Sequence, residues 1–231
     1  MRLTSILLQG HGEKSSPEIY LQVVAQALPE LAANDAMLAA RLLDIPSAHE
    51  LASAIHKDYD PELVKAQREG LYQQLALALK DQWSELYTQL PIQAYEDSAE
   101  ARGNRALRNV VLDMALTANV DGATGWAEQQ YDNASCMTER FGALKAMVNH
   151  QLANADKYLA DFYHRFENND LVIDLWFSVQ ASADAVTPDT IKSLLAHKDF
   201  DWNTPNRVRS VISAFTSQPT VLWTAEGLDI Y

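Results

Sequence analysis

Apolar residues recur at intervals of three and four along most of the chain, which is the spacing of one face of an α-helix. The clearest case begins at Asp60-Pro61, where an N-cap residue precedes a proline at the first helical position. The apolar face that follows comprises Leu63, Leu71, Leu75, Leu79, Trp83, Leu86 and Leu90. This pattern predicts one long helix that ends before Pro91.

The rest of the chain shows the same pattern in further segments joined by short connections. The expected helices cover residues 17–33, 35–43, 47–55, 100–118, 124–131, 138–151, 154–168 and 171–181. Thr187-Pro188 and Thr204-Pro205 mark the starts of two more, each with a capping residue before a proline. Residues 171–181 are apolar on nearly every side, so we expect a buried central helix there.

Alternating apolar and polar positions, typical of strands, are essentially absent. The sequence therefore predicts an all-α fold without a β-sheet. Many helices with short links favour a superhelix of antiparallel helical pairs, an α-solenoid of the HEAT or armadillo type. No repeat of fixed period and no linker rich in Gly, Ser or Pro divides the chain. We expect residues 1–231 to form a single helical domain.

Charge and composition narrow the possible partners. The 18 basic and 31 acidic residues give a formal net charge of −13, which repels phosphate backbones and anionic lipid. We therefore expect neither nucleic acid nor a membrane as a partner. The single Cys136 cannot form an internal disulfide, and the first ten residues hold no signal-peptide apolar region. Both observations favour a cytoplasmic location.

One short stretch resembles a metal motif. His49-Glu50 begins like the zinc-binding HExxH, in which two histidines four residues apart share a helical face. Here the fifth position is Ser53, and the next histidine is His56, about 10 Å further along a helix axis. One zinc ion does not readily bridge that distance, so we interpret the stretch as a polar helix start. We predict no metal ligand and no catalytic residue in this chain.

Three charged residues stand out. Asp174 lies inside the apolar run 171–177, where a carboxylate is costly unless it pairs with an arginine or a helix N-terminus. Arg207 and Arg209 flank the apolar stripe of the helix that follows Thr204, on opposite sides at about 100° per residue. Two readings of these arginines stay open: salt bridges to acidic residues, or binding of a ligand's carboxylate or carbonyl.

Four segments, in order and at similar spacing, carry a family resemblance. They are RALRN at 105–109, MTER at 137–140, DLVIDLWFSVQA at 170–181 and the stretch from Asn203 to Phe215. With them the chain resembles the C-terminal domain of bacterial aminopeptidase N, a gluzincin family. The resemblance extends from about residue 39 onward and is weaker before it.

The resemblance implies an enzyme that removes N-terminal amino acids from peptides with one zinc ion. The zinc ligands would lie in an upstream catalytic domain, outside this chain. That upstream domain and peptide substrates would then be its partners. The family's C-terminal domain closes over the active site and limits which substrates enter. Arg209 and Arg207 match family positions near that cavity, so the resemblance implies that they line it.

The family's domain continues for several helices beyond the point where this chain ends. We therefore expect an incomplete C-terminal domain, inactive alone, with Val221, Leu222, Trp223 and Ile230 exposed. The alternative is a HEAT-like scaffold without enzymatic function, which binds another protein through its concave face. The matching segments favour the aminopeptidase.

Overall fold

The computed structural model describes residues 17–53, 60–217 and 225–230. Helices and turns account for their regular structure, and these ranges contain no strand, which confirms the all-α prediction. The chain divides into two compact units, residues 1–146 and 147–231, and the boundary falls inside helix α9 (Met137–Asn149). The single domain expected over residues 1–231 stays a prediction.

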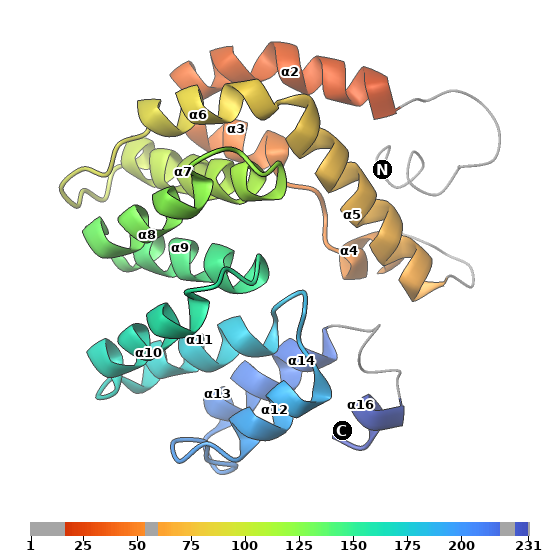
Figure 1. Cartoon of the computed structure of the whole chain (residues 1–231), viewed down its shortest axis with the longest axis vertical. Coiled ribbons are helices and arrows are strands. Elements are labelled where there is room, and N and C mark those ends of the chain that lie inside the picture. The colour runs from red at the N-terminus through yellow and green to blue at the C-terminus, as the bar shows by residue number, and fades with distance from the viewer. Residues whose placement is uncertain (1–16, 54–59, 218–224, 231) are drawn as a thin grey trace. The chain divides into compact units, whose positions relative to one another are not determined.

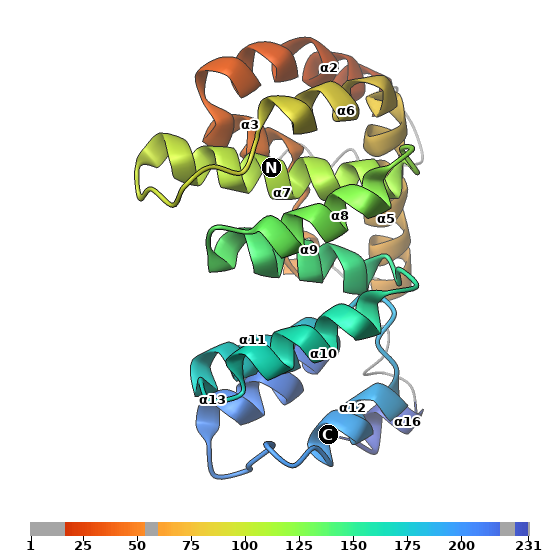
Figure 2. The same cartoon turned by 60° about the vertical axis from the view of Figure 1, so that its left-hand side comes forward.

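The first unit is a set of helices with α7 at its centre (Figure 1). They are α2 (Pro17–Asn34), α3 (Ala36–Leu43), α4 (Ala48–Ser53), α5 (Pro61–Ala78), α6 (Lys80–Gln89), α7 (Ala99–Thr117), α8 (Ala123–Asn133) and the first part of α9. Figure 2 shows α3, α6 and α8 beside α7, and these three helices and α5 all contact it. Helix α2 covers α3 and also contacts α5.

Local side-chain bonds start several of these helices as the sequence predicts. The carboxylate of Asp60 accepts the backbone N–H of Glu62 at 2.9 Å and that of Leu63 at 3.3 Å. At α4, Glu50 Oε2 accepts from Ser47 N at 2.8 Å while Ser47 Oγ accepts from Glu50 N at 3.2 Å. This reciprocal capping box confirms the polar helix start. His56 lies outside the described residues.

The prediction of one continuous helix after Asp60 is wrong at Leu79, where α5 ends and α6 begins. The indole Nε1 of the buried Trp83 donates to the carbonyl of Ala76 at 2.8 Å. An unbroken helix would offer that carbonyl to the backbone N–H of Lys80. The break therefore gives a fully buried indole the acceptor that it needs.

The buried face of α5 also starts one residue later than predicted. Leu63 is 54% exposed, whereas Val64 is 4% exposed and takes its place in the core. The remaining apolar positions of the predicted face, from Leu71 to Leu90, are all buried.

A buried amide joins α7, α8 and α9. Gln130 is 0% exposed; its Nε2 donates to Asn109 Oδ1 at 2.7 Å and to the carbonyl of Glu139 at 3.0 Å. Its Oε1 accepts from Arg108 Nε at 3.0 Å and lies 3.0 Å from the Tyr87 hydroxyl. Both donors and the acceptor of the amide are used, and an unsatisfied one would be costly. The amide thus fixes how these helices align.

The second unit is built around α11 (Asp170–Ala181). Its other elements are α10 (Ala155–Phe166), α12 (Pro188–Leu195), α13 (Pro205–Val208), the π-helix η1 (Arg209–Ser213), α14 (Ala214–Thr216) and α16 (Ala225–Leu228). Helix α11 contacts α10, α12, α13, η1 and α14, which confirms the predicted central helix. Its burial is less complete than predicted, since Leu171 is 70% exposed and Trp176 is only partly buried.

The end of the chain differs from the prediction in its helix type and in the burial of Ile230. The helix after Thr204 is not α-helical throughout, because residues 209–213 form a π-helix. Ser210 Oγ donates to the carbonyl of Arg207 at 2.8 Å and so competes for an acceptor of the α-helical ladder. Ile230 packs against the core of this unit, so its expected exposure is wrong. Val221, Leu222 and Trp223 lie outside the described residues.

The packing of α9 against Asn109 predicts the effect of two glycine substitutions. A Cβ at Gly142 would overlap the side-chain amide of Asn109, which also donates to the Thr138 carbonyl at 3.1 Å. We expect Gly142→Ala to lower the free energy of unfolding by about 1–3 kcal/mol. Gly125, in α8, has open space around its Cβ position. Gly125→Ala should raise the free energy of unfolding by about 0.5–1 kcal/mol.

Urea denaturation of both variants measures this difference. Equal effects of the two substitutions would contradict the close contact between Gly142 and the Asn109 amide.

Candidate functional site

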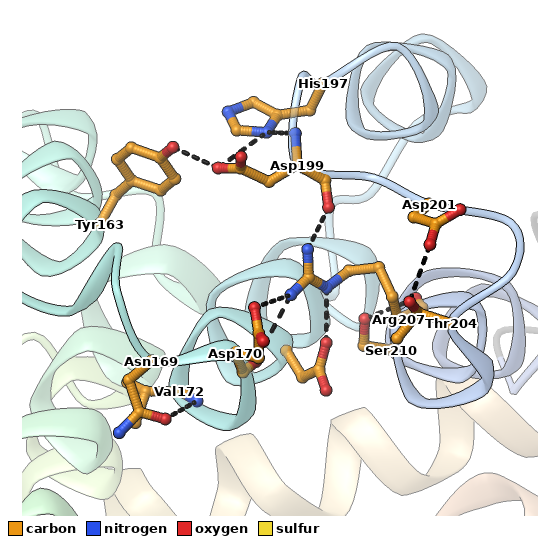
Figure 3. A network of polar contacts seen from close by, with 11 residues as sticks. Tyr163, Asn169, Asp170, Val172, His197, Asp199, Asp201, Thr204, Arg207 and Ser210 are labelled. Carbon is orange, nitrogen blue, oxygen red and sulfur yellow. Dashed lines mark hydrogen bonds and ion pairs between the residues drawn. The ribbon is translucent and has the colours of Figure 1, made fainter.

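The second unit contains a polar network centred on the guanidinium of Arg207 (Figure 3), which is 4% exposed. Arg207 Nε donates to Asp174 Oδ1 at 2.5 Å, and Nη1 donates to the carbonyl of Asp199. Nη2 lies 3.7 Å from Asp170 Oδ1. The guanidinium also stacks over Phe177, 4.9 Å from the ring centroid. A buried cation is costly, and these partners compensate for it.

Of the two partners expected for Asp174, an arginine or a helix N-terminus, the network shows the arginine. The Asp174 side chain is 14% exposed, and its partner comes from a segment 33 residues further along the chain. The pair joins α11 to α13, so the segments 170–181 and 203–215 meet at one ion pair. Breaking such a pair leaves a charge without compensation in a mostly apolar environment.

Arg209 has a different environment, although it lies only two residues further along. It is the first residue of η1, it is exposed, and its Nη1 lies 3.4 Å from Asn206 Oδ1. It forms no salt bridge with the described residues. Short π-helical turns occur frequently at functional sites. Its guanidinium is available to a carbonyl or carboxylate group from outside the chain.

The connection between α12 and α13 packs against the same network. The Tyr163 hydroxyl donates to the carboxylate of Asp199, and the Asp199 backbone N–H donates to His197 Nδ1 at 3.2 Å. The imidazole of His197 lies 5.3 Å from the Tyr163 ring, 5.0 Å from Trp176 and 5.5 Å from Phe177, measured between centroids. The aromatic rings and the turn hydrogen bond hold this connection in place.

Burial lowers the pKa of His197 below its usual value of 6.5. The cations Lys198 and Arg207 act in the same direction, and the nearby carboxylate of Asp199 acts against it. The neutral imidazole also fits the geometry, because its Nδ1 must accept the N–H of Asp199.

Asp201 organises the last turn before α13. Its carboxylate accepts from Asn203 N at 2.9 Å, from Asn203 Nδ2 at 3.0 Å and from Thr204 Oγ1 at 2.9 Å. The backbone hydrogen bond from Asn203 is the largest of the contributions that lower the pKa of Asp201. Thr204 holds the predicted N-cap position of α13, but its hydroxyl bonds Asp201 and not the helix.

The four segments of the family resemblance meet in pairs. Segments 105–109 and 137–140 meet at the buried amide of Gln130, and segments 170–181 and 203–215 meet at Arg207. Gln130 is a polar residue on the otherwise apolar buried face of α8, and that position is the one signal in the sequence that could mark it. His197 and Asp199 carry no such signal, because their packing depends on contacts distant in the sequence.

The described residues include no group of three or more His, Cys, Asp or Glu side chains that could hold a metal ion. Among the described helices, none combines the length and the apolar composition that crossing a bilayer requires.

The lowered pKa of His197 predicts a pH dependence of stability. The unfolded chain binds this proton more readily than the folded chain, so the free energy of unfolding should fall as the pH drops below 6.5. In His197→Asn the amide Oδ1 replaces Nδ1 as acceptor and does not titrate. We expect the parent chain to lose more stability than this variant between pH 7.5 and 5.5 (about one unit on either side of the ordinary histidine pKa), as measured by urea denaturation. Parallel losses would contradict a neutral, shielded imidazole.

The chain matches a known protein family and two proteins named aminopeptidase N. Residues 2–228 match the family described as "Domain of unknown function (DUF3458_C) ARM repeats". Aminopeptidase N of Haemophilus influenzae is 31% identical over 210 residues, which are 90% of this chain and 24% of that protein. Aminopeptidase N of Escherichia coli is 32% identical over 195 residues, which are 84% of this chain and 22% of that protein.

The chain is also similar in structure to a solved aminopeptidase. The crystal structure of Legionella pneumophila aminopeptidase A in complex with aspartic acid matches with a TM-score of 0.83 and 27% sequence identity. That match covers 99% of this chain and 28% of the other. The chain thus spans about a quarter of the length of the relatives that it matches. The ARM repeats of the family confirm the predicted armadillo-like class. The chain therefore belongs to the DUF3458_C family of ARM-repeat domains, and it is similar to the C-terminal domain of bacterial aminopeptidase N.

Proposed function

We propose that this chain is the C-terminal domain of a zinc-dependent aminopeptidase that removes N-terminal amino acids from peptides. The observation that carries the proposal is the match of 84–90% of the chain to proteins named aminopeptidase N at 31–32% identity. The zinc ion and the catalytic residues lie in an upstream domain of the same enzyme. The single Cys136, which cannot form an internal disulfide, favours a cytoplasmic location for it.

In this proposal the domain encloses the active-site cavity and limits access to peptides. Arg209 lines the cavity and contacts the peptide beyond its first residues. Its exposure, its place at the start of a π-helix and its lack of a salt bridge with the described residues support this role. A guanidinium suits peptide carbonyl and carboxylate oxygens, to which it donates in a fixed planar geometry.

Arg207 contributes to the same cavity wall as a positioning residue. Its bonds to Asp174 and to the Asp199 carbonyl connect α11, the 197–204 connection and α13. With 4% of its surface exposed, it offers little of its guanidinium to a substrate. It therefore holds the segment that carries Arg209.

Reconstitution tests the proposed function. The chain is mixed with a separately expressed upstream catalytic domain of an aminopeptidase N, and hydrolysis of alanine and leucine anilides is measured with zinc present. We expect no hydrolysis by the chain alone and a change in kcat/KM of the catalytic domain on mixing. Zinc-dependent hydrolysis by the chain alone would overturn the proposal. So would unchanged kinetics under conditions where sedimentation shows the two proteins bound, a result that favours a non-enzymatic scaffold.

The two arginines form a matched pair of substitutions. Arg209→Ala removes an exposed side chain, so the free energy of unfolding should stay within about 0.5 kcal/mol of the parent. In the mixed enzyme it should raise KM for tetrapeptides about tenfold, the effect of losing about 1.4 kcal/mol of binding, and change anilide hydrolysis little. If Arg209→Ala and the parent have equal KM values for tetrapeptides, Arg209 does not line the cavity.

Arg207→Ala should act mainly on stability. It leaves the carboxylate of Asp174 without its partner, and we expect a loss of about 3 kcal/mol in urea denaturation. The double variant Arg207→Ala/Asp174→Ala should be more stable than Arg207→Ala, because it removes the charge that is left unpaired. If the double variant is instead the less stable of the two, the ion pair does not account for the burial of Arg207.

A further inference from the structure

The first unit contains a pocket that the proposed function does not use. It lies between the start of α7 and the connection from α6, and it is lined by Arg105, Arg108, Glu139, Asn104, Gln89 and Gln93, among others. Segments 105–109 and 137–140, which carry the family resemblance, both contribute to it. Its volume is about 50 Å³. A water molecule needs roughly 10–15 Å³, so the pocket suits a ligand of about three to five heavy atoms.

Three of the lining side chains are charged and more than nine-tenths buried. Arg105 is 9% exposed, Arg108 is 8% exposed and Glu139 is 3% exposed. None of the three forms a salt bridge with the described residues. Burying a charge without a counter-charge is unfavourable, and here two cations and one anion line the same small space.

The hydrogen bonds of these groups leave atoms available to the pocket. Arg105 donates through Nη1 to the carbonyl of Glu96 at 2.9 Å, and its Nε and Nη2 make no hydrogen bond with the described residues. Glu139 Oε2 accepts from Ser135 N at 2.8 Å and from Ser135 Oγ at 3.0 Å. Its other oxygen, Oε1, accepts no hydrogen bond from the described part of the chain. A donor pair and an acceptor therefore remain beside the pocket.

The backbone around the pocket is well anchored. Arg108 donates to the carbonyls of Leu90 and Tyr87, at the end of α6, and stacks 4.0 Å from the Tyr87 ring centroid. Protein contacts thus hold the walls of the pocket in place, and the fold of this region does not require a bound ligand.

We propose that this pocket binds a small zwitterion of the chemical class of free α-amino acids. The ligand's carboxylate accepts from Arg105 and Arg108, because charge-assisted bonds from guanidinium to carboxylate are strong and directional. Its ammonium group donates to Oε1 of Glu139. A zwitterion supplies both missing counter-charges at once, which neither a simple anion nor a simple cation does.

Glycine is the probe, because its five heavy atoms match the size of the pocket. Acetate and methylammonium each carry one of its two charged groups. Titrations of the 231-residue chain are followed by NMR chemical shifts at constant pH and ionic strength. We expect glycine to bind with a Kd on the order of 1 mM. Acetate should bind at least about tenfold more weakly, and methylammonium should not saturate.

Variants separate the two halves of the site. Arg105→Gln should weaken glycine binding about tenfold or more. Glu139→Gln should remove the preference for glycine over acetate, because the neutral amide no longer attracts the ammonium group. Arg102→Gln is the matched control: Arg102 lies on the same helix but does not line the pocket, and its side chain is 53% exposed. That variant should bind glycine like the parent chain.

Thermal unfolding confirms that each variant is folded before it is titrated. No saturable shift up to about 100 mM glycine, far above the expected Kd, would overturn the proposal. Equal binding of acetate and glycine by the parent chain would overturn the role of Glu139. Equal weakening by Arg102→Gln and Arg105→Gln would show that surface charge, and not the pocket, attracts the ligand. None of these outcomes depends on peptidase activity.

Discussion

In the second unit, the cost of burying one guanidinium determines how the surrounding elements are arranged. Arg207 projects from α13, and its acceptors come from α11 and from the connection that carries Asp199. Asp174 occupies a position on α11 that an apolar side chain would otherwise fill, among Ile173 and Phe177 of the core. The ion pair therefore favours the one register in which the segment of Asp174 and the segment of Arg207 also bury their apolar side chains.

The first unit obeys the same constraint through a neutral group. Gln130 is fully buried, and its amide is satisfied from α6, α7 and α9. Next to it, however, Arg105 and Glu139 are nearly as buried and lack a salt bridge with the described residues. Gln130 has all its hydrogen-bond partners, whereas Arg105 and Glu139 have no counter-charge among the described residues. Buried charges of this kind indicate a ligand site more strongly than exposed charges do.

The sequence predicts the local features of this structure well because their causes are local. The cap at Asp60, the polar helix start at Ser47 and the central position of residues 171–181 each follow from neighbouring residues. The sequence also limits the partner of Asp174 to an arginine or a helix N-terminus, because a carboxylate in an apolar run has few alternatives. The break at Leu79 does not follow from the local pattern, since it depends on the tertiary need of the Trp83 indole for the Ala76 carbonyl. Gln130 and His197 depend likewise on partners far away in the sequence.

Arg207 and Arg209, two residues apart on one segment, have separate environments. Helical spacing places them on opposite sides of one stripe, and the structure buries the first while it exposes the second. Burial fixes the geometry of Arg207 and uses its donors, which leaves it little to offer a peptide. Exposure alone would leave Arg209 flexible, but it begins a π-helix whose preceding turn is anchored by Arg207 and Asp201. In the proposed cavity wall, a guanidinium on a backbone held in this way would lose less conformational entropy on binding a peptide than one on an unanchored segment.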